Sequence, residues 1–196
     1  MRWVDVAGPP GVGKSTLMDD LWPPNCIPLK KGSLPKEWKD FIRITEALLD
    51  KVKRHKSYRA CLGMTDRAFR KIASVFQMED DKVYIQTGLF QRGLGIGWRL
   101  KDPEYIRPYF ETMPVSIGAV SLFADIEEVK RRNVARGKDR SYMVQPMERP
   151  RQIAVEILKN RIPLIELDTM RSIDECRADL LTFSDKAVQI NHLRAA

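Results

Sequence analysis

Residues 8 to 15 read Gly-Pro-Pro-Gly-Val-Gly-Lys-Ser and fill every fixed position of the Gly-x4-Gly-Lys-Ser/Thr phosphate loop. A short apolar stretch, residues 2–7, precedes them, and residues 15–18 can open a helix, so the motif has the strand, turn and helix context that it requires. The glycines allow consecutive backbone amides to turn inward around a phosphate. The sequence therefore predicts a nucleoside triphosphate site near the start of the chain.

Individual residues of this loop have distinct expected roles. Lys14 would bring a cation to the phosphates, and Ser15 would offer its hydroxyl to Mg²⁺. The helix that starts near Lys14 would point the positive end of its dipole at the same anion. The predicted nucleotide contacts are Gly8, Gly11, Val12, Gly13, Lys14, Ser15 and Thr16.

Length and composition favour one domain over residues 1–196, since 43% of the 196 residues are hydrophobic and can form a sizeable core. No apolar run approaches the roughly 20 residues that cross a bilayer, and the phosphate loop lies where a secretory signal would be. A cytoplasmic protein without membrane contact is expected. The three cysteines are far apart and lack the spacing of a zinc or redox motif.

The net charge of +8 is the main sign of a polyanionic partner. Ten basic and four acidic residues lie between Lys30 and Arg59. Solvated helix faces explain such an excess equally well, because net charge alone does not identify a ligand. The composition leaves open whether nucleic acid is the partner.

Four β-type runs alternate with helical segments along the chain; they cover residues 2–7, 82–87, 115–123 and 163–168. This alternation is typical of a parallel sheet with right-handed crossovers. It predicts a three-layer α/β/α fold.

Helices are expected at about 36–54, in a second segment that ends before residue 79, and at 172–183. The first two form a helical insertion at about 28–80, between the phosphate loop and the next strand. Residues from Ser184 onward show little pattern.

A second informative region runs from Asp125 to Arg140, where a helix should follow a buried strand and end near Gly137. Arg132 and Arg136 share one helical face, so together with Arg140 they can converge on a phosphate group and stabilise the charge of phosphoryl transfer. We predict a lid at about 126–145 that carries these three arginines. Arg131 and Lys138 are interpreted as exposed cations at a helix end.

The chain resembles the nucleoside and nucleotide kinases of the P-loop fold. The resemblance rests on residues 8–16, 131–140 and 165–175. It implies ATP as the donor and Mg²⁺ as the metal, with Lys14 and Ser15 at the phosphates, the lid arginines on the transferring group, and the loop after Asp168 near the adenine. It also implies that the helical insertion holds the acceptor.

The strand at 82–87 departs from the family pattern. Such kinases commonly end this strand with an acidic residue, whereas the sequence here is Gln86-Thr87-Gly88. Gln86 can hydrogen-bond an acceptor but cannot act as a general base, so either another acid serves or positioning and charge neutralisation suffice. Gln91 and Arg92 are further predicted acceptor contacts.

Two other carboxylates are candidates for the missing base. Asp66, beside the predicted acceptor contact Arg67, is the first, because an acid next to a cation stays ionised. Asp5 is the second, since an acid inside a buried strand is costly unless it is paired or functional. For both, a structural ion pair is the alternative interpretation.

The glycines at 93, 95 and 97 resemble a dinucleotide-binding sequence only superficially, because the spacing is wrong and no strand, turn and helix context is expected there. Trp98 could stack on a base, but an aromatic residue that seals the core is the commoner case.

These observations favour an ATP-dependent kinase with a nucleotide-like acceptor. The acceptor is either a nucleoside monophosphate or a hydroxymethylated pyrimidine, such as 5-hydroxymethyluracil in DNA, as modified by phage P-loop kinases. The alternative is a nucleotide-binding switch or assembly ATPase, although the chain lacks the guanine-reading sequence Asn-Lys-x-Asp. The oligomeric state does not follow from the sequence.

Overall fold

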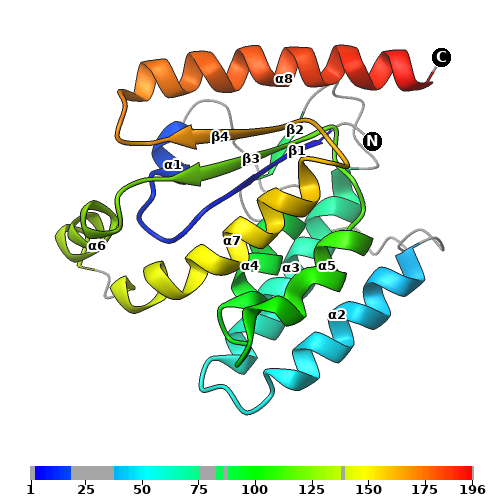
Figure 1. Ribbon diagram of the computed structural model, residues 1–196, viewed down its shortest axis with the longest axis vertical. Coiled ribbons are helices and arrows are strands. Elements are labelled where there is room, and N and C mark those ends of the chain that lie inside the picture. Colours follow the sequence, from blue (N-terminus) through cyan, green and yellow to red (C-terminus); the bar gives the residue numbers. More distant parts are fainter. Residues whose placement is uncertain (1–2, 19–37, 76–82, 86–87, 138–139, 196) are drawn as a thin grey trace.

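A computed structural model of the chain describes residues 3–18, 38–75, 83–85, 88–137 and 140–195. The described strands form one parallel sheet in the order β2-β1-β3-β4 (Figure 1). Their bounds are Trp3–Ala7 for β1, Val83–Ile85 for β2, Gly118–Phe123 for β3 and Leu164–Asp168 for β4. The four predicted strands and their parallel arrangement are confirmed.

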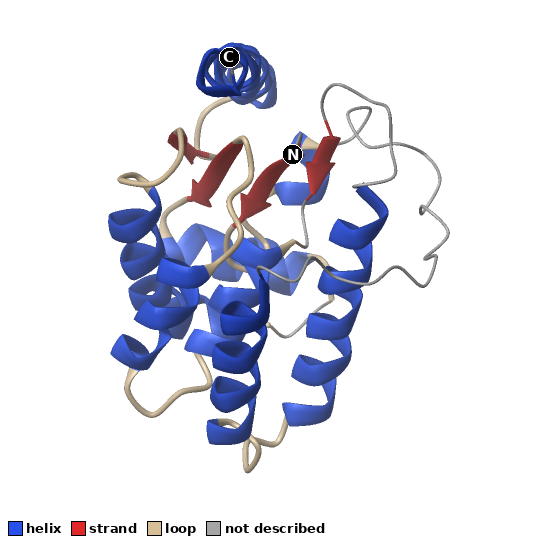
Figure 2. Ribbon diagram, turned by 90° about the vertical axis from the view of Figure 1, so that its right-hand side faces the viewer, coloured by secondary structure: helices blue, strands red, loops and turns tan. Residues whose placement is uncertain are grey.

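Helices cover both faces of this sheet, which lies between α8 and the main helical layer (Figure 2). The main layer contains α2 (Lys39–Lys51), α3 (Tyr58–Val75), α4 (Leu89–Gly97), α5 (Arg107–Thr112) and α7 (Val144–Leu158). The other face packs against α1 (Lys14–Leu17) and α8 (Ile173–Ala195), with α6 (Ile126–Ala135) beside them. Two short 3₁₀ helices, η2 (Pro103–Ile106) and η3 (Ser141–Met143), complete the described elements. The predicted three-layer α/β/α fold is confirmed.

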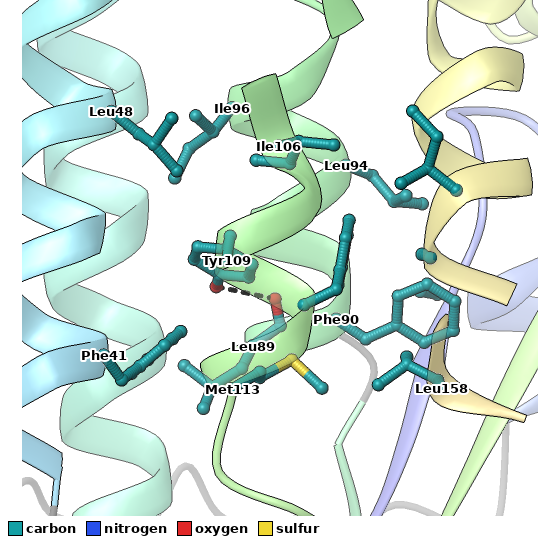
Figure 3. Close-up of a cluster of buried hydrophobic side chains, with 14 of the residues drawn as sticks. Phe41, Leu48, Leu89, Phe90, Leu94, Ile96, Ile106, Tyr109, Met113 and Leu158 are labelled. Atoms are coloured by element: carbon teal, nitrogen blue, oxygen red, sulfur yellow. Dashed lines mark hydrogen bonds between the residues drawn. The ribbon is translucent and has the colours of Figure 1, made fainter. Parts of the chain in front are cut away.

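The core of the main layer is aromatic and aliphatic (Figure 3). Phe41 of α2 packs edge-on against Tyr109 of α5, with ring centroids 4.9 Å apart. The Tyr109 hydroxyl donates to the Leu89 carbonyl at 2.9 Å, so its polar atom is satisfied inside the core. Phe41, Thr45, Leu48 and Val52 are all buried, which confirms the apolar face predicted for the first inserted helix.

Helix α4 was not expected, because it contains glycines at 93, 95 and 97 and glycine disfavours a helix interior. Packing explains it. A Cβ on Gly97 would lie 2.8 Å from Pro150 of α7, and one on Gly93 would overlap the Phe110 ring. The glycines therefore allow close approach to α5 and α7. The sequence predicted no strand and helix around these glycines, whereas the structure places them inside a helix that follows strand β2. The glycines lie within the helix and not in a turn that could surround a ligand.

The last helix is longer than predicted, since α8 continues through Ser184 to Ala195. Ser184 and Ala187 are buried against the sheet, and Ser184 shares a 2.7 Å hydrogen bond with the Tyr84 hydroxyl. The sequence pattern missed this half of the helix because the residues that face the sheet are small or polar. Among the helices described, none is long and apolar enough to cross a membrane.

Candidate active site

The phosphate loop joins β1 to α1 in a conformation that needs glycine. Gly11 has φ 86° and Gly13 has φ 99°, both in the left-handed region. Gly13 caps α1, and its carbonyl accepts from Leu17 N at 2.9 Å. Side-chain-bearing residues rarely adopt these angles, so the glycines of the motif shape the loop.

Lys14 is the cation at the centre of this loop. Its Nζ donates to the carbonyls of Gly8 at 2.6 Å and Pro9 at 2.9 Å. Burial, together with the positive charges of Arg92, Arg136 and Arg140, lowers the pKa of Lys14 to about 7. Three predicted site arginines from α4 and the lid are thus within electrostatic reach of the loop lysine.

Helix α6, in the segment predicted to form a lid, starts directly after β3, where Asp125 caps it by accepting from Glu127 N and Glu128 N. Arg132 donates to Glu128 at 2.8 Å and to the Thr169 carbonyl at 3.1 Å, which ties α6 to the loop after β4. Arg131 also pairs with Glu128, as expected for a surface cation.

Arg136 and Arg140 are exposed and line a cavity of about 160 Å³ together with Lys14, Ser15 and Asn133. No carboxylate of the described residues pairs with either guanidinium. Both charges are therefore available to an anion in this cavity.

A larger cavity of about 480 Å³ lies next to the first, between α1, α6 and the start of α8. Its lining includes Gly13, Thr16, Arg136, Met170 and Cys176. The volume falls within the roughly 300–1,000 Å³ typical of ligand pockets. Arg136 lines both cavities, so one ligand can extend from the loop into the larger space.

Asn133 is a site residue that the sequence did not reveal. Its side-chain amide donates to the Pro10 carbonyl at 2.8 Å and to the Val129 carbonyl at 3.0 Å. A Cβ on Gly11 would lie 2.5 Å from the same amide nitrogen, so α6 packs directly on the loop. The only sequence signal was its place one residue after Arg132.

Arg92 lies in α4 and is 8% exposed, with no hydrogen-bond partner for its Nε among the described residues. Burial lowers its pKa. The positive charge of Arg92 lowers the pKa of both Lys14 and Asp5. A buried cation with an unpaired donor fits an anionic or hydroxyl-bearing acceptor.

Asp5 is 1% exposed and accepts from Phe90 N at 2.9 Å, near the N-terminus of α4. A Cβ on Gly88 would lie 2.7 Å from its carboxylate oxygens. Burial raises the pKa of Asp5 to about 7, against the lowering effect of the Phe90 amide and Arg92. These contacts favour the structural interpretation of Asp5 as a cap for α4 supplied by a neighbouring strand.

Gln91 and Gln86 are two further predicted acceptor contacts. Gln91 is buried, and its Oε1 accepts from Gly8 N at 3.0 Å, so it links α4 to the phosphate loop. Gln86 lies outside the described residues.

Asp66 and Arg67 are not brought to the loop. Both are exposed on α3, where Asp66 pairs with Arg70 at 2.9 Å and Arg67 donates to the Gly63 carbonyl. The structure therefore offers no contact that supports Asp66 as a base or Arg67 as an acceptor contact. Their side chains bond within their own helix, which helical spacing alone allows.

The residues present fit a magnesium nucleotide. Ser15 is exposed beside Lys14 in the smaller cavity. Mg²⁺ commonly takes one or two protein oxygens and completes its shell with phosphate oxygens and water, so a single hydroxyl suits it. The described residues contain no group of three or more His, Cys, Asp or Glu side chains able to hold a metal without a phosphate ligand.

The glycine loop, the parallel sheet and the arginine-bearing helix α6 give the chain an overall fold that solved nucleoside kinase structures share. Among solved structures, the chain is similar to deoxyadenosine kinase from M. mycoides with the products dCMP and a flexible dCDP bound. The TM-score is 0.59 at 12% identity, over 94% of this chain and 99% of that one.

The same kinase with bound dATP gives a TM-score of 0.57 at 12% identity, over 93% and 98% of the two chains. With bound dCTP the TM-score is 0.55 at 11% identity, over 94% and 99%. No protein-family model matches the chain, and no curated protein is significantly similar in sequence. The predicted resemblance is confirmed at the level of the fold.

Proposed function

We propose that the chain is an ATP-dependent kinase that transfers the γ-phosphoryl group of Mg-ATP to a nucleoside or nucleotide acceptor. The observation that carries this proposal is that Arg136 and Arg140 line one cavity with Lys14 of the glycine loop, while the charge of Arg92 also acts on Lys14. These cations come from α4, the lid and the loop itself. Such an arrangement suits a polyphosphate and the charge that spreads over a transferring phosphoryl group.

The proposed roles follow from the positions of the groups. The loop amides and Lys14 hold the phosphates, while Arg136 and Arg140 neutralise the equatorial oxygens as the acceptor oxygen bonds to the γ-phosphorus and the bond to ADP breaks. Arg132 keeps α6 against Thr169 and so orients the lid. Ser15 would hold Mg²⁺ beside the loop, and the ion would withdraw charge from the phosphates. The cavity of about 480 Å³ receives the nucleoside of the donor.

Arg92 is the proposed acceptor contact. A phosphate acceptor is ionised at neutral pH and needs no strong base, whereas a hydroxyl acceptor must lose a proton. Among the described residues no exposed carboxylate lines the cavity at the loop. This supports catalysis by positioning and charge neutralisation. The M. mycoides deoxyadenosine kinase was solved with dCMP as a product and with dATP and dCTP bound, which supports an acceptor of the deoxynucleoside or deoxynucleotide class here.

The acceptor is tested by incubating the protein with radiolabelled ATP and separate acceptors. These are free deoxynucleosides, nucleoside monophosphates, plain DNA and DNA that contains 5-hydroxymethyluracil. Label on a monophosphate identifies a nucleotide kinase, and label on modified DNA alone identifies a DNA-modifying kinase. Label on no acceptor overturns the proposal.

The kinase is separated from a nucleotide-binding switch by two variants. Lys14→Ala should abolish turnover and weaken ATP binding, whereas Arg136→Ala should lower kcat about 10²-fold or more with a smaller effect on affinity. Arg131→Ala is the matched control, since this arginine pairs with Glu128 outside both cavities. A switch would tolerate Arg136→Ala.

A further inference from the structure

An exposed surface of basic and aromatic residues lies at the end of the helical layer. It consists of the turn from α2 to α3, residues 51–57, together with Tyr105 of η2 and Tyr142 of η3. Lys51 Nζ is 4.5 Å from the centroid of the Tyr105 ring, and Lys56 Nζ is 5.6 Å from that of Tyr142. Tyr105 is 53% exposed and Tyr142 is 52% exposed. We call this set the basic turn.

Residues at the end of α4 pack against the basic turn. Trp98 packs edge-on against His55, with ring centroids 5.0 Å apart, and against Tyr142 at 6.1 Å. Arg99 lies 4.3 Å from the Trp98 ring and donates from Nε to Ser57 Oγ at 2.7 Å. The surface is therefore held in place by the core, so little ordering is needed before a ligand binds.

The positive charge of the basic turn is only partly compensated. Lys53 pairs with Asp50 at 3.7 Å, whereas no carboxylate in the described part of the chain pairs with Arg54 or Lys56. Aromatic rings flanked by unpaired cations match a ligand that alternates flat bases with phosphates.

One residue of the basic turn is close in sequence to the candidate active site. Tyr142 follows Arg140 by two residues, and Arg140 lines the cavity that contains Lys14. A strand bound on Tyr142 and Lys56 would therefore lie near Arg140.

From these contacts we infer that the basic turn binds single-stranded nucleic acid, with bases stacked on Tyr105 and Tyr142 and phosphates on the neighbouring lysines. A duplex hides the faces of its bases, whereas an unpaired strand offers them for stacking. The inference rests on the proposed function and deepens it, because it makes a nucleotide within a strand the acceptor class that this surface recruits.

Binding is measured by fluorescence anisotropy with a labelled single-stranded DNA of about 20 nucleotides and the full chain, without ATP, from about 50 to 300 mM salt. The Kd should rise with salt, with a slope of about 0.7 for each phosphate contact. Tyr105→Ala combined with Tyr142→Ala should weaken binding about tenfold or more and leave the slope unchanged. Lys51→Gln combined with Lys56→Gln should lower the slope by about one or more.

The matched control is Lys159→Gln combined with Lys186→Gln, which removes the same charge from exposed positions beyond the basic turn, after α7 and on α8. Thermal unfolding of each variant checks that the fold is retained. Equal losses in the control and in the basic-turn variants would overturn the inference, as would duplex DNA that binds as tightly as the single strand.

The same preparations are assayed for phosphoryl transfer to free nucleosides, to free nucleotides and to DNA. DNA binding without transfer to any of these acceptors would contradict the proposed function alone. Kinase activity on free nucleotides without salt-dependent DNA binding would contradict this inference alone.

Discussion

The protonation state of Lys14 in the phosphate loop depends on its burial and on nearby arginines. Its pKa of about 7 reflects burial and three nearby guanidinium groups, so a part of the population is neutral at physiological pH. A phosphate beside Nζ would favour the charged form and raise this pKa. Binding of a triphosphate should then take up a proton.

We expect the affinity for ATP to fall as the pH rises above about 7, by up to about tenfold per pH unit. Calorimetry in buffers of different ionisation enthalpy measures the proton uptake directly. Because ATP itself titrates nearby, the quantity compared is the difference between wild type and Lys14→Ala. An identical proton count in both proteins would contradict the assignment.

The pKa of Asp5 is raised, whereas that of Lys14 is lowered. Burial raises the pKa of Asp5 in the folded protein to about 7, from an ordinary value of 3.8. The folded protein therefore binds more protons than the unfolded chain between these two values. The stability that Asp5 contributes is present below about 3.8 and is lost as the pH rises through about 7.

Asp5→Asn should remove this dependence, because asparagine keeps a carbonyl acceptor for Phe90 N but does not titrate. Relative to the variant, wild type should lose up to about 4 kcal/mol of unfolding free energy across this window. Urea unfolding at several pH values measures the difference. Asp125→Asn, at the exposed cap of α6, controls for loss of a capping carboxylate. Parallel pH profiles for wild type and Asp5→Asn would exclude a protonated Asp5.

At the scale of elements, the structure attaches the lid helix to the phosphate loop through one side chain. Asn133 joins Val129 of its own helix to Pro10 of the loop, and Gly11 leaves it the necessary space. Gln91 of α4 makes a similar link to Gly8. The loop is therefore positioned by α6 and α4 as well as by its own glycines.

Asn133→Ala should weaken ATP binding several-fold and destabilise the fold by about 1–2 kcal/mol, because it leaves the half-buried Pro10 carbonyl without its donor. Titration of ATP and thermal unfolding measure the two effects. Asn160→Ala is the matched control, since Asn160 also donates to a carbonyl four residues earlier but is exposed at the end of α7. If both variants bind ATP equally well, the link to Pro10 does not organise the loop.

At the scale of the whole molecule, α8 closes one face of the sheet and holds α1 in place. Arg177 donates to the carbonyls of Thr16 and Leu17 at the end of α1. Further along, a Cβ on Gly118 of β3 would lie 3.0 Å from Phe183 and 3.3 Å from Ala187. The second half of α8 therefore belongs to the core.

Ala187→Asp should lower the melting temperature by about 10 °C, because an unpaired buried charge costs several kcal/mol. In a chain of this size, each kcal/mol of lost stability lowers the melting temperature by about 2–4 °C. Gln189→Asp adds the same charge at an exposed position of the helix and should change stability by about 0.5 kcal/mol or less. Circular dichroism follows both transitions. A similar melting temperature for both variants would show that α8 does not pack tightly beyond Ser184.

Local features of this protein were predictable from the sequence. The loop motif at 8–15, the four strands and the capped helix after Asp125 each depend on neighbouring residues, so spacing and residue type suffice to predict them. The same reasoning predicted that this helix ends near Gly137, and Arg136 is its C-cap residue.

Contacts between distant elements were not predictable in this way. That Asn133 reaches Pro10, that Gln91 and Arg92 are buried beneath the loop, and that Asp66 remains on an exposed face depend on how helices pack. Periodicity indicates which residues share a face of their own helix, but not which element covers that face. Only the tertiary packing brings the lid, α4 and the loop around Lys14, because the residues involved are up to about 130 positions apart in the chain.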